Sequence, residues 1–244
     1  MTQTEALAPT INAEFGELLL TTYNDPAKNP VHLLFNQWWA HAPESVKERY
    51  VARFLAEPRN EEFVAEGYYS DPIDLEALGR LQEGTLGRTY YDWIVDHDLA
   101  AAIATDYRAF HELLESQGIL DGMPDSLKYA VLRGFQTHDF QHVLTGYDAS
   151  GPGEIALQAF CLSQIQFPYF GMWMSVVTTR MTFAEPDSIV PMMDAISAGW
   201  QAGRQVGNIQ CERWETMLDQ PLVDLRARFD IAPGGCPTPH ALVS

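Results

Sequence analysis

Two histidines, an aspartate and a glutamate stand close together in the stretch HDFQHVLTGYDASGPGE, residues 138–154. His138 and His142 are four positions apart, which on an α-helix places both imidazoles on one face and offers two nitrogens to a single cation. Asp139 follows the first histidine directly, and Glu154 comes twelve positions after the second. Because the donors are nitrogen and carboxylate oxygen without a thiolate, we predict a divalent-metal site for zinc or iron.

The helix that carries the histidines is predicted to run from about Leu127 to Gly146. At 100° per residue, the apolar Leu127, Val131 and Phe135 span about 80° of the helical wheel, and both histidines fall within the same arc. Burying two imidazoles is costly unless their nitrogens find partners, and one cation would supply a partner for each ring. Asp139 lies on the flank, where it could bind the cation, orient a histidine or act as a base. The alternative is a histidine pair of the core or surface that binds no ion.

A short turn is expected to bring the glutamate back to this helix. Within residues 147–153, Ser150 is suited to be an N-cap and Pro152 to the first turn of the next helix. Glu154 would then lie in that first turn, where the helix dipole favours a carboxylate. Four ligands are therefore expected to converge, namely His138, Asp139, His142 and Glu154.

Size and charge limit the class of protein. A chain of 244 residues with 46% hydrophobic residues can bury a full core. Its formal net charge of −18 argues against nucleic acid as a partner, because nucleic-acid binding needs clustered Lys and Arg. The three cysteines cannot form a closed disulfide set, and the first ten residues, MTQTEALAPT, lack the pattern of a secretory or organelle-targeting signal. We expect a cytoplasmic protein.

Helical periodicity dominates the chain, and no stretch of useful length alternates as a β-strand would. We predict an all-α fold of about ten helices in one domain at residues 11–231, between a flexible N-terminus, 1–10, and a flexible C-terminal tail, 232–244. Besides the helix to Gly146, the predicted helices follow Pro43, open at Asp71-Pro72, and cover Leu99–Ser116, Ile189–Val206, Cys211–Leu218 and Leu222–Phe229.

The stretch from Ile155 to Thr179 contains no charged residue. It does contain several glutamines and a proline, whose polar groups would lack partners in the hydrocarbon of a membrane. We predict a buried helix that is broken near Pro168.

Four stretches together resemble one family. The residues His138, Asp139, His142 and Glu154 match the HDxxH-x11-E signature of the coenzyme Q (ubiquinone) biosynthesis protein four family. LQEGTLGRTYYDWI, residues 81–94, is similar to that family's Pro-Glu-Gly-Thr-Phe-Gly-Arg turn. GEIALQAFCLSQIQFP resembles its Gly-Glu-x-Ala-x-Lys-x-Phe helix, and CERWETMLDQPLVDLRARFDI resembles its C-terminal segments.

The resemblance covers about residues 75–231 and has two departures. The family leads into the metal motif with Arg-Tyr-Arg-Glu, whereas this chain has RGFQT at 133–137. The segment HELLESQGILDGMPDSL, 111–127, is longer than the family's link.

The resemblance implies an all-helical fold, a bound divalent ion, a prenyl-lipid pocket and attachment to the ubiquinone-synthesising proteins at the membrane. It also implies a reaction, in which the carboxyl group at C1 of a prenylated hydroxybenzoate is removed oxidatively and replaced by hydroxyl. The alternative is a non-catalytic scaffold that binds a prenyl lipid and holds a structural metal. We further expect a homodimer that contacts the inner face of the cell membrane peripherally.

The uncharged stretch after the glutamate could line a channel for the isoprenoid tail, and the alternative is that it is plain core. The residues expected to bind the tail are Phe160, Phe167, Phe170, Trp173 and Met174. A third hypothesis is a hydrolase of the HD type, which needs a further histidine and aspartate on separate helices. His97, His111 and Asp194 are the candidates for those positions.

Overall fold

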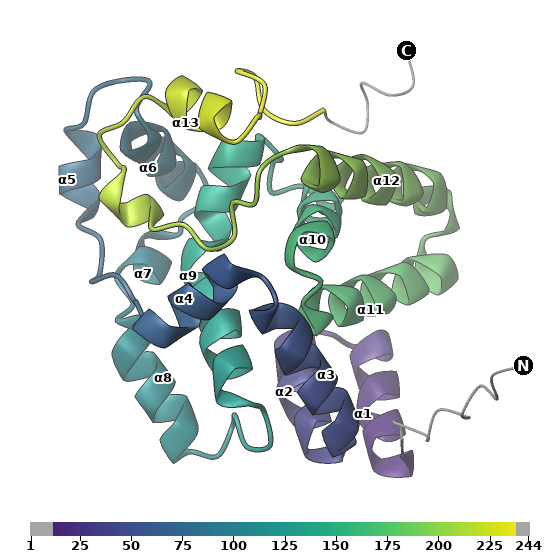
Figure 1. Ribbon diagram of the computed structural model, residues 1–244. Helices are drawn as coiled ribbons and strands as arrows, with labels where there is room; N and C mark the ends of the chain where they lie inside the picture. Colours follow the sequence, from purple (N-terminus) through teal and green to yellow (C-terminus); the bar gives the residue numbers. More distant parts are fainter. Residues whose placement is uncertain (1–11, 238–244) are drawn as a thin grey trace, which may run out of the picture.

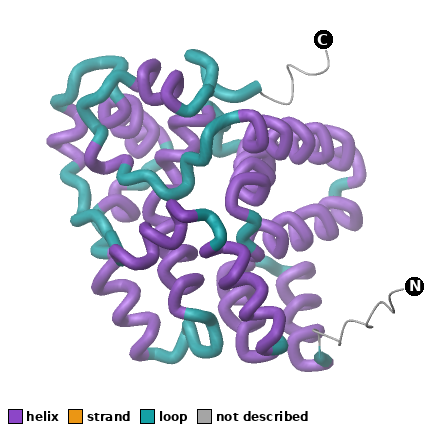
Figure 2. The backbone as a smooth tube through the Cα atoms, viewed as in Figure 1, coloured by secondary structure: helices purple, strands orange, loops and turns teal. Residues whose placement is uncertain are grey.

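The computed structural model describes residues 12–237, and within them the chain forms thirteen α-helices, eleven of them seven residues or longer, and no strand (Figures 1 and 2). The all-α prediction is therefore confirmed. The helices are α1 (Ala13–Asn24), α2 (Val31–His41), α3 (Glu44–Leu55), α4 (Pro58–Glu66), α5 (Leu75–Gly79), α6 (Leu86–Asp96), α7 (Ala100–Ile103), α8 (Tyr107–Ser116), α9 (Asp125–Thr145), α10 (Gly151–Ile165), α11 (Pro168–Ala184), α12 (Ile189–Gln205) and α13 (Leu222–Arg228).

The longest helix, α9, runs through the middle of the molecule (Figure 1). Its first half packs in a core with α1 to α4, through buried residues such as Leu127 and Leu132. Its second half packs in another core with α6, α10, α12 and α13, through residues such as Phe140 and Leu144. One helix therefore joins two hydrophobic cores.

Helices α10 and α12 pack with almost no space between their backbones. A Cβ atom added at Gly199 of α12 would lie 1.9 Å from the carbonyl oxygen of Ala156, and one added at Gly203 would lie 2.6 Å from that of Phe160. Only glycine allows this approach. This close contact fixes the position of α10 relative to α12.

Several predicted helix boundaries are confirmed and three are wrong. Helix α5 begins three residues later than predicted, because Asp74 rather than Asp71 accepts hydrogen bonds from the free backbone N–H groups. The helix predicted over 99–116 is divided into α7 and α8, since the Asp106 carboxylate caps a new helix. The predicted helix at 211–218 is only a 3₁₀ turn at Trp214–Thr216.

The uncharged stretch is broken near Pro168, as predicted: α10 ends at Ile165 and α11 begins at Pro168. The prediction that the stretch is buried is right for most of α10 and wrong for α11, in which Val176 is the one buried residue. Across residues 12–237, no helix combines the length and the apolar character needed to cross a membrane. The predicted flexible segment 1–10 and residues 238–244 of the tail lie outside the described residues. Within 232–237, Cys236 is buried and its N–H donates to the Thr145 carbonyl.

Candidate metal centre

The predicted turn between the two ligand-bearing helices is present. Helix α9 ends at Gly146, whose φ of 77° is left-handed, and the Ser150 hydroxyl accepts a hydrogen bond from the Gly153 N–H as the cap of α10. Pro152 lies in the first turn of α10. Glu154 therefore stands one turn into α10 and faces back to α9.

His138, His142 and Glu154 form one cluster, in which a potential ligand atom from each residue lies within 4.8 Å of the others. His142 Nε2 is 3.2 Å from Glu154 Oε1, and His138 Nε2 is 3.6 Å from Glu154 Oε2. Two imidazole nitrogens and a carboxylate thus point at one small volume.

The His142 ring is held in one tautomer. Its Nδ1 lies 2.9 Å from the Tyr147 carbonyl oxygen, which can only accept, so Nδ1 carries the proton and Nε2 is left with a lone pair. Trp93 stacks on the ring with centroids 4.7 Å apart. Nε2 is buried and makes no hydrogen bond to any residue of 12–237. A buried imidazole lone pair beside a carboxylate and a second imidazole fits a divalent cation.

Asp139 lies behind His138 and outside the cluster. Its Oδ1 is 3.4 Å from His138 Nδ1, the ring nitrogen that faces away from Glu154. Of the roles left open by the sequence, this geometry favours orientation of His138.

The charges of His138 and Glu154 compensate each other within the cluster. Burial lowers the pKa of His138, but the nearby carboxylates of Asp139 and Glu154 outweigh it and raise that pKa to about 9. Burial raises the pKa of Glu154, but the nearby imidazoles of His138 and His142 outweigh it and lower that pKa to about 2. Without a cation, the cluster is therefore an ion pair in which His138 holds the proton.

A cavity of about 300 Å³ opens beside the cluster. His138, Asp139 and Glu154 form part of its wall. Phe167, Phe170 and Trp173, three of the five residues predicted to bind the tail, line it, together with Phe54, Phe63, Phe135, Tyr129 and Tyr169. The other two predicted residues do not line it: Phe160 lies in the core beside Tyr147, and Met174 lies on α11 away from the wall.

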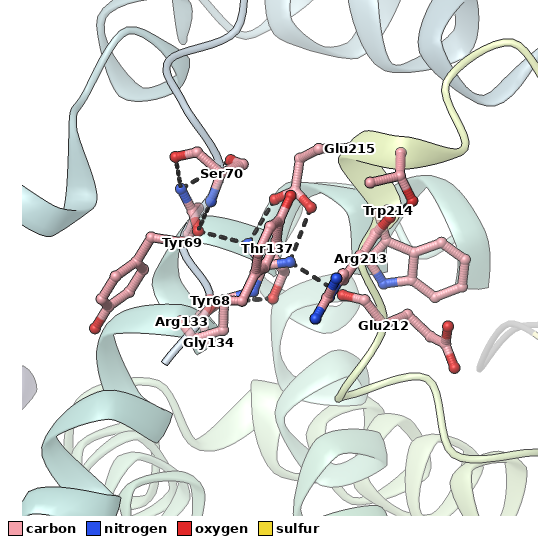
Figure 3. A network of polar contacts seen from close by, with 12 residues as sticks. Tyr68, Tyr69, Ser70, Arg133, Gly134, Thr137, Glu212, Arg213, Trp214 and Glu215 are labelled. Atoms are coloured by element: carbon pink, nitrogen blue, oxygen red, sulfur yellow. Dashed lines mark hydrogen bonds and ion pairs between the residues drawn. The ribbon is translucent and has the colours of Figure 1, made fainter. Parts of the chain in front are cut away.

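Arg133 is a buried residue of the cavity wall that the sequence analysis did not select. Its guanidinium donates to both carboxylate oxygens of Glu215, at 2.5 and 2.8 Å, and to the Glu212 carbonyl at 3.0 Å (Figure 3). It also donates to Gln136, whose amide nitrogen binds Ser70. One feature of the sequence could have identified it. Arg133 lies among buried positions of α9 and has no acidic residue one helical turn away to pair with.

The residues required by the hydrolase hypothesis are not brought together. His97 is exposed and stacks on Trp93, and the His111 Nδ1 is hydrogen-bonded to the Tyr69 hydroxyl at 3.1 Å. Neither they nor Asp194 belong to the cluster.

The fold and site define a class of all-α protein in which a His-His-Glu cluster that could hold a metal ion adjoins an aromatic-walled cavity. The family model described as "Coenzyme Q (ubiquinone) biosynthesis protein Coq4" matches residues 68–234. The chain belongs to the Coq4 family, which confirms the resemblance found in the sequence.

Relatives from fungi match the same region. The mitochondrial ubiquinone biosynthesis protein COQ4 of Pyricularia oryzae is 28% identical over 169 residues, which are 67% of this chain and 49% of that protein. The protein of the same name from Kluyveromyces lactis is 23% identical over 167 residues, 67% of this chain and 45% of that protein. This chain thus matches about half the length of these relatives.

A solved structure shares the fold. It is a crystal structure from Nostoc punctiforme PCC 73102 of a protein provisionally assigned to ubiquinone biosynthesis. The TM-score is 0.69 at 22% identity, with 88% of this chain and 95% of that chain covered.

Proposed function

We propose that this protein is a metal-dependent enzyme of ubiquinone biosynthesis that removes the C1 carboxyl group of a prenylated hydroxybenzoate oxidatively. His138, His142 and Glu154 would hold the divalent ion, zinc or iron. The observation that carries the proposal is that this cluster adjoins a cavity with aromatic walls. A ligand with an anionic head, an aromatic ring and an isoprenoid tail matches those surroundings.

The proposed reaction is balanced as follows. The bond from C1 to the carboxyl carbon breaks, the carboxyl group leaves as CO₂, and a hydroxyl group forms at C1. One oxygen atom of dioxygen becomes the ring hydroxyl, and the other is reduced to water. For a substrate carboxylate, the reaction takes up two electrons from an external donor and three protons, two of which end in the water and one in the hydroxyl group. When bound, the cation would supply Lewis-acid or redox chemistry next to the substrate carboxylate.

The residues of the chain position the reactants. The Tyr147 carbonyl fixes the His142 ring, and the Asp139 carboxylate lies behind His138. Aromatic walls would exclude water from the substrate ring, which strengthens electrostatic contacts at the cluster. Phe167, Phe170 and Trp173 would contact the tail.

The scaffold alternative makes a different demand on the site. Structural zinc sites are closed by four protein ligands, whereas catalytic sites keep a position open. Three clustered ligand residues within 12–237, two of them in a cavity wall, favour the enzyme.

Partners and location stay predictions. We infer contact with other ubiquinone biosynthesis proteins, with a second copy of the chain and, peripherally, with a membrane. Exposed apolar side chains suited to such contact include Phe183, Val190 and Met193, near the connection between α11 and α12.

The test is metal analysis of protein purified without an affinity metal, combined with an assay for C1 decarboxylation. Wild type should carry about one ion and turn over a prenylated hydroxybenzoate, and His142→Ala and Glu154→Gln should lose both. Exposed His32→Ala is the matched control and should lose neither. Metal retained in all variants would refute the site, and metal without turnover in wild type would support the scaffold.

A further inference from the structure

Gln158 is a buried polar residue of the cavity wall with an uncompensated oxygen. Its side chain is only 5% exposed, and it lines the cavity beside the cluster. The amide oxygen Oε1 is inaccessible to solvent and makes no hydrogen bond within residues 12–237. Such an unpaired atom destabilises the folded protein.

The neighbouring glutamines are paired. Gln141 Nε2 donates to Gln210 Oε1 at 3.2 Å, and Gln210 Nε2 donates to Gln164 Oε1 at 3.3 Å. Cys161 completes this group by donating to Gln141 Oε1 at 3.0 Å. The fold satisfies these three amides from within, whereas the oxygen of Gln158 has no such partner among residues 12–237.

Gln158 lies on the same helix as Glu154 of the cluster. It follows Glu154 by four residues on α10, so the two side chains leave the same face of the helix, about 6 Å apart along its axis. That separation is of the size of one substituted aromatic ring. A ligand whose carboxylate lies at the cluster can therefore present a second polar group to the amide.

We infer that Gln158 determines the specificity of the cavity by hydrogen bonding a hydroxyl group on the aromatic ring of the ligand, away from its carboxylate. This inference rests on the proposed function, which supplies the aromatic acid. Because Oε1 is shielded from solvent, the amide nitrogen Nε2 is the atom that would donate to the oxygen of this hydroxyl group. Sites that hydrogen bond a substrate hydroxyl discriminate against the analogue that lacks it.

Binding of two probes tests the inference on the protein as purified, with its metal content measured. One probe is 3-geranyl-4-hydroxybenzoate, and the other is 3-geranylbenzoate, which lacks the ring hydroxyl. Dissociation constants are measured by calorimetry for wild type, Gln158→Met and the matched control Gln201→Met, an exposed position on α12. Wild type and control should prefer the hydroxylated probe about tenfold, and Gln158→Met should bind both probes equally.

Melting temperatures without ligand separate a binding role from a structural one. Gln158→Met removes an unpaired buried oxygen, so its melting temperature should equal or exceed that of wild type. A lower value would show that Gln158 supports the fold and would overturn the inference. Equal binding of both probes by wild type would also overturn it, while leaving the proposed function intact. If wild type binds neither probe, the proposed function fails and the inference fails with it.

Discussion

Buried polar side chains around the cavity are compensated in different ways. Arg133 is neutralised by a bidentate pair with Glu215, and His142 gives one nitrogen to the Tyr147 carbonyl. His142 Nε2, Gln158 Oε1 and Arg133 Nε make no hydrogen bond to residues of 12–237. His142 Nε2 faces the position where a cation would bind, and Gln158 lines the cavity where a ligand would bind.

The Arg133–Glu215 pair should be costly to break from one side. Arg133→Met leaves a carboxylate that is only 6% exposed without its partner, so stability should fall by about 3–5 kcal/mol. The double variant Arg133→Met/Glu215→Leu should recover most of that loss. The measurement is urea unfolding at pH 7.

Arg80→Met is the matched control, because Arg80 pairs with Glu76 on the surface and the exposed pair should contribute below about 1 kcal/mol. Equal losses in Arg133→Met and Arg80→Met would show that the buried pair has no special role.

Between helices, the close packing of α10 and α12 positions Glu154 and Gln158. Ala156, which lies between them in the chain, is the residue that Gly199 touches. Any displacement of α12 is therefore transmitted to the two residues that face the cavity.

Gly199→Ala should destabilise the protein by about 1–3 kcal/mol, because the new methyl group collides with the Ala156 backbone. It should also weaken metal binding, since α10 must move. In contrast, a Cβ at Gly171 of α11 meets nothing within 4 Å, so Gly171→Ala should stabilise by about 0.5–1 kcal/mol. Thermal unfolding and cation titration of both variants check this. Stabilisation by Gly199→Ala would contradict the packing described.

The sequence predicts features that depend on neighbouring residues. Gly146 and Ser150 mark the end of α9 and the start of α10 because a left-handed residue and a side-chain cap are local requirements. The spacing of the two histidines likewise placed them on one face, and the short turn brought the glutamate to them.

Features that depend on distant partners were not predicted. The ionic partner of Arg133 is Glu215, 82 positions later in the chain, and Glu215 lies in the 3₁₀ turn that replaces the predicted helix at 211–218. The free oxygen of Gln158 is likewise a property of the packed cavity. In the sequence, Phe160 and Phe167 are indistinguishable as candidates for the cavity wall. Only the rotation of α10 about its axis decides that Phe160 lies in the core.

In the whole molecule, α9 connects the two cores, and the cluster lies where they meet. His138 and His142 lie at the start of the second half of α9, just after the half that packs with α1 to α4. Glu154 lies on α10. A cation bound by all three would link α9 to α10 in the folded state alone, because the unfolded chain has no such cluster. The domain should therefore unfold in one transition that depends on the cation.

We expect calorimetry to show a single transition that moves upward by about 5–10 °C when free Zn²⁺ exceeds its dissociation constant a hundredfold, since this adds about 2.7 kcal/mol to the stability of the folded state. His142→Ala in the same buffers is the necessary control, because a chain with a formal net charge of −18 attracts cations at many surface sites. Its melting temperature should be the same with Zn²⁺ and with EDTA. An equal upward shift in His142→Ala would mean that the stabilising ion binds elsewhere on the acidic surface, and two separate transitions would mean that α9 does not couple the cores.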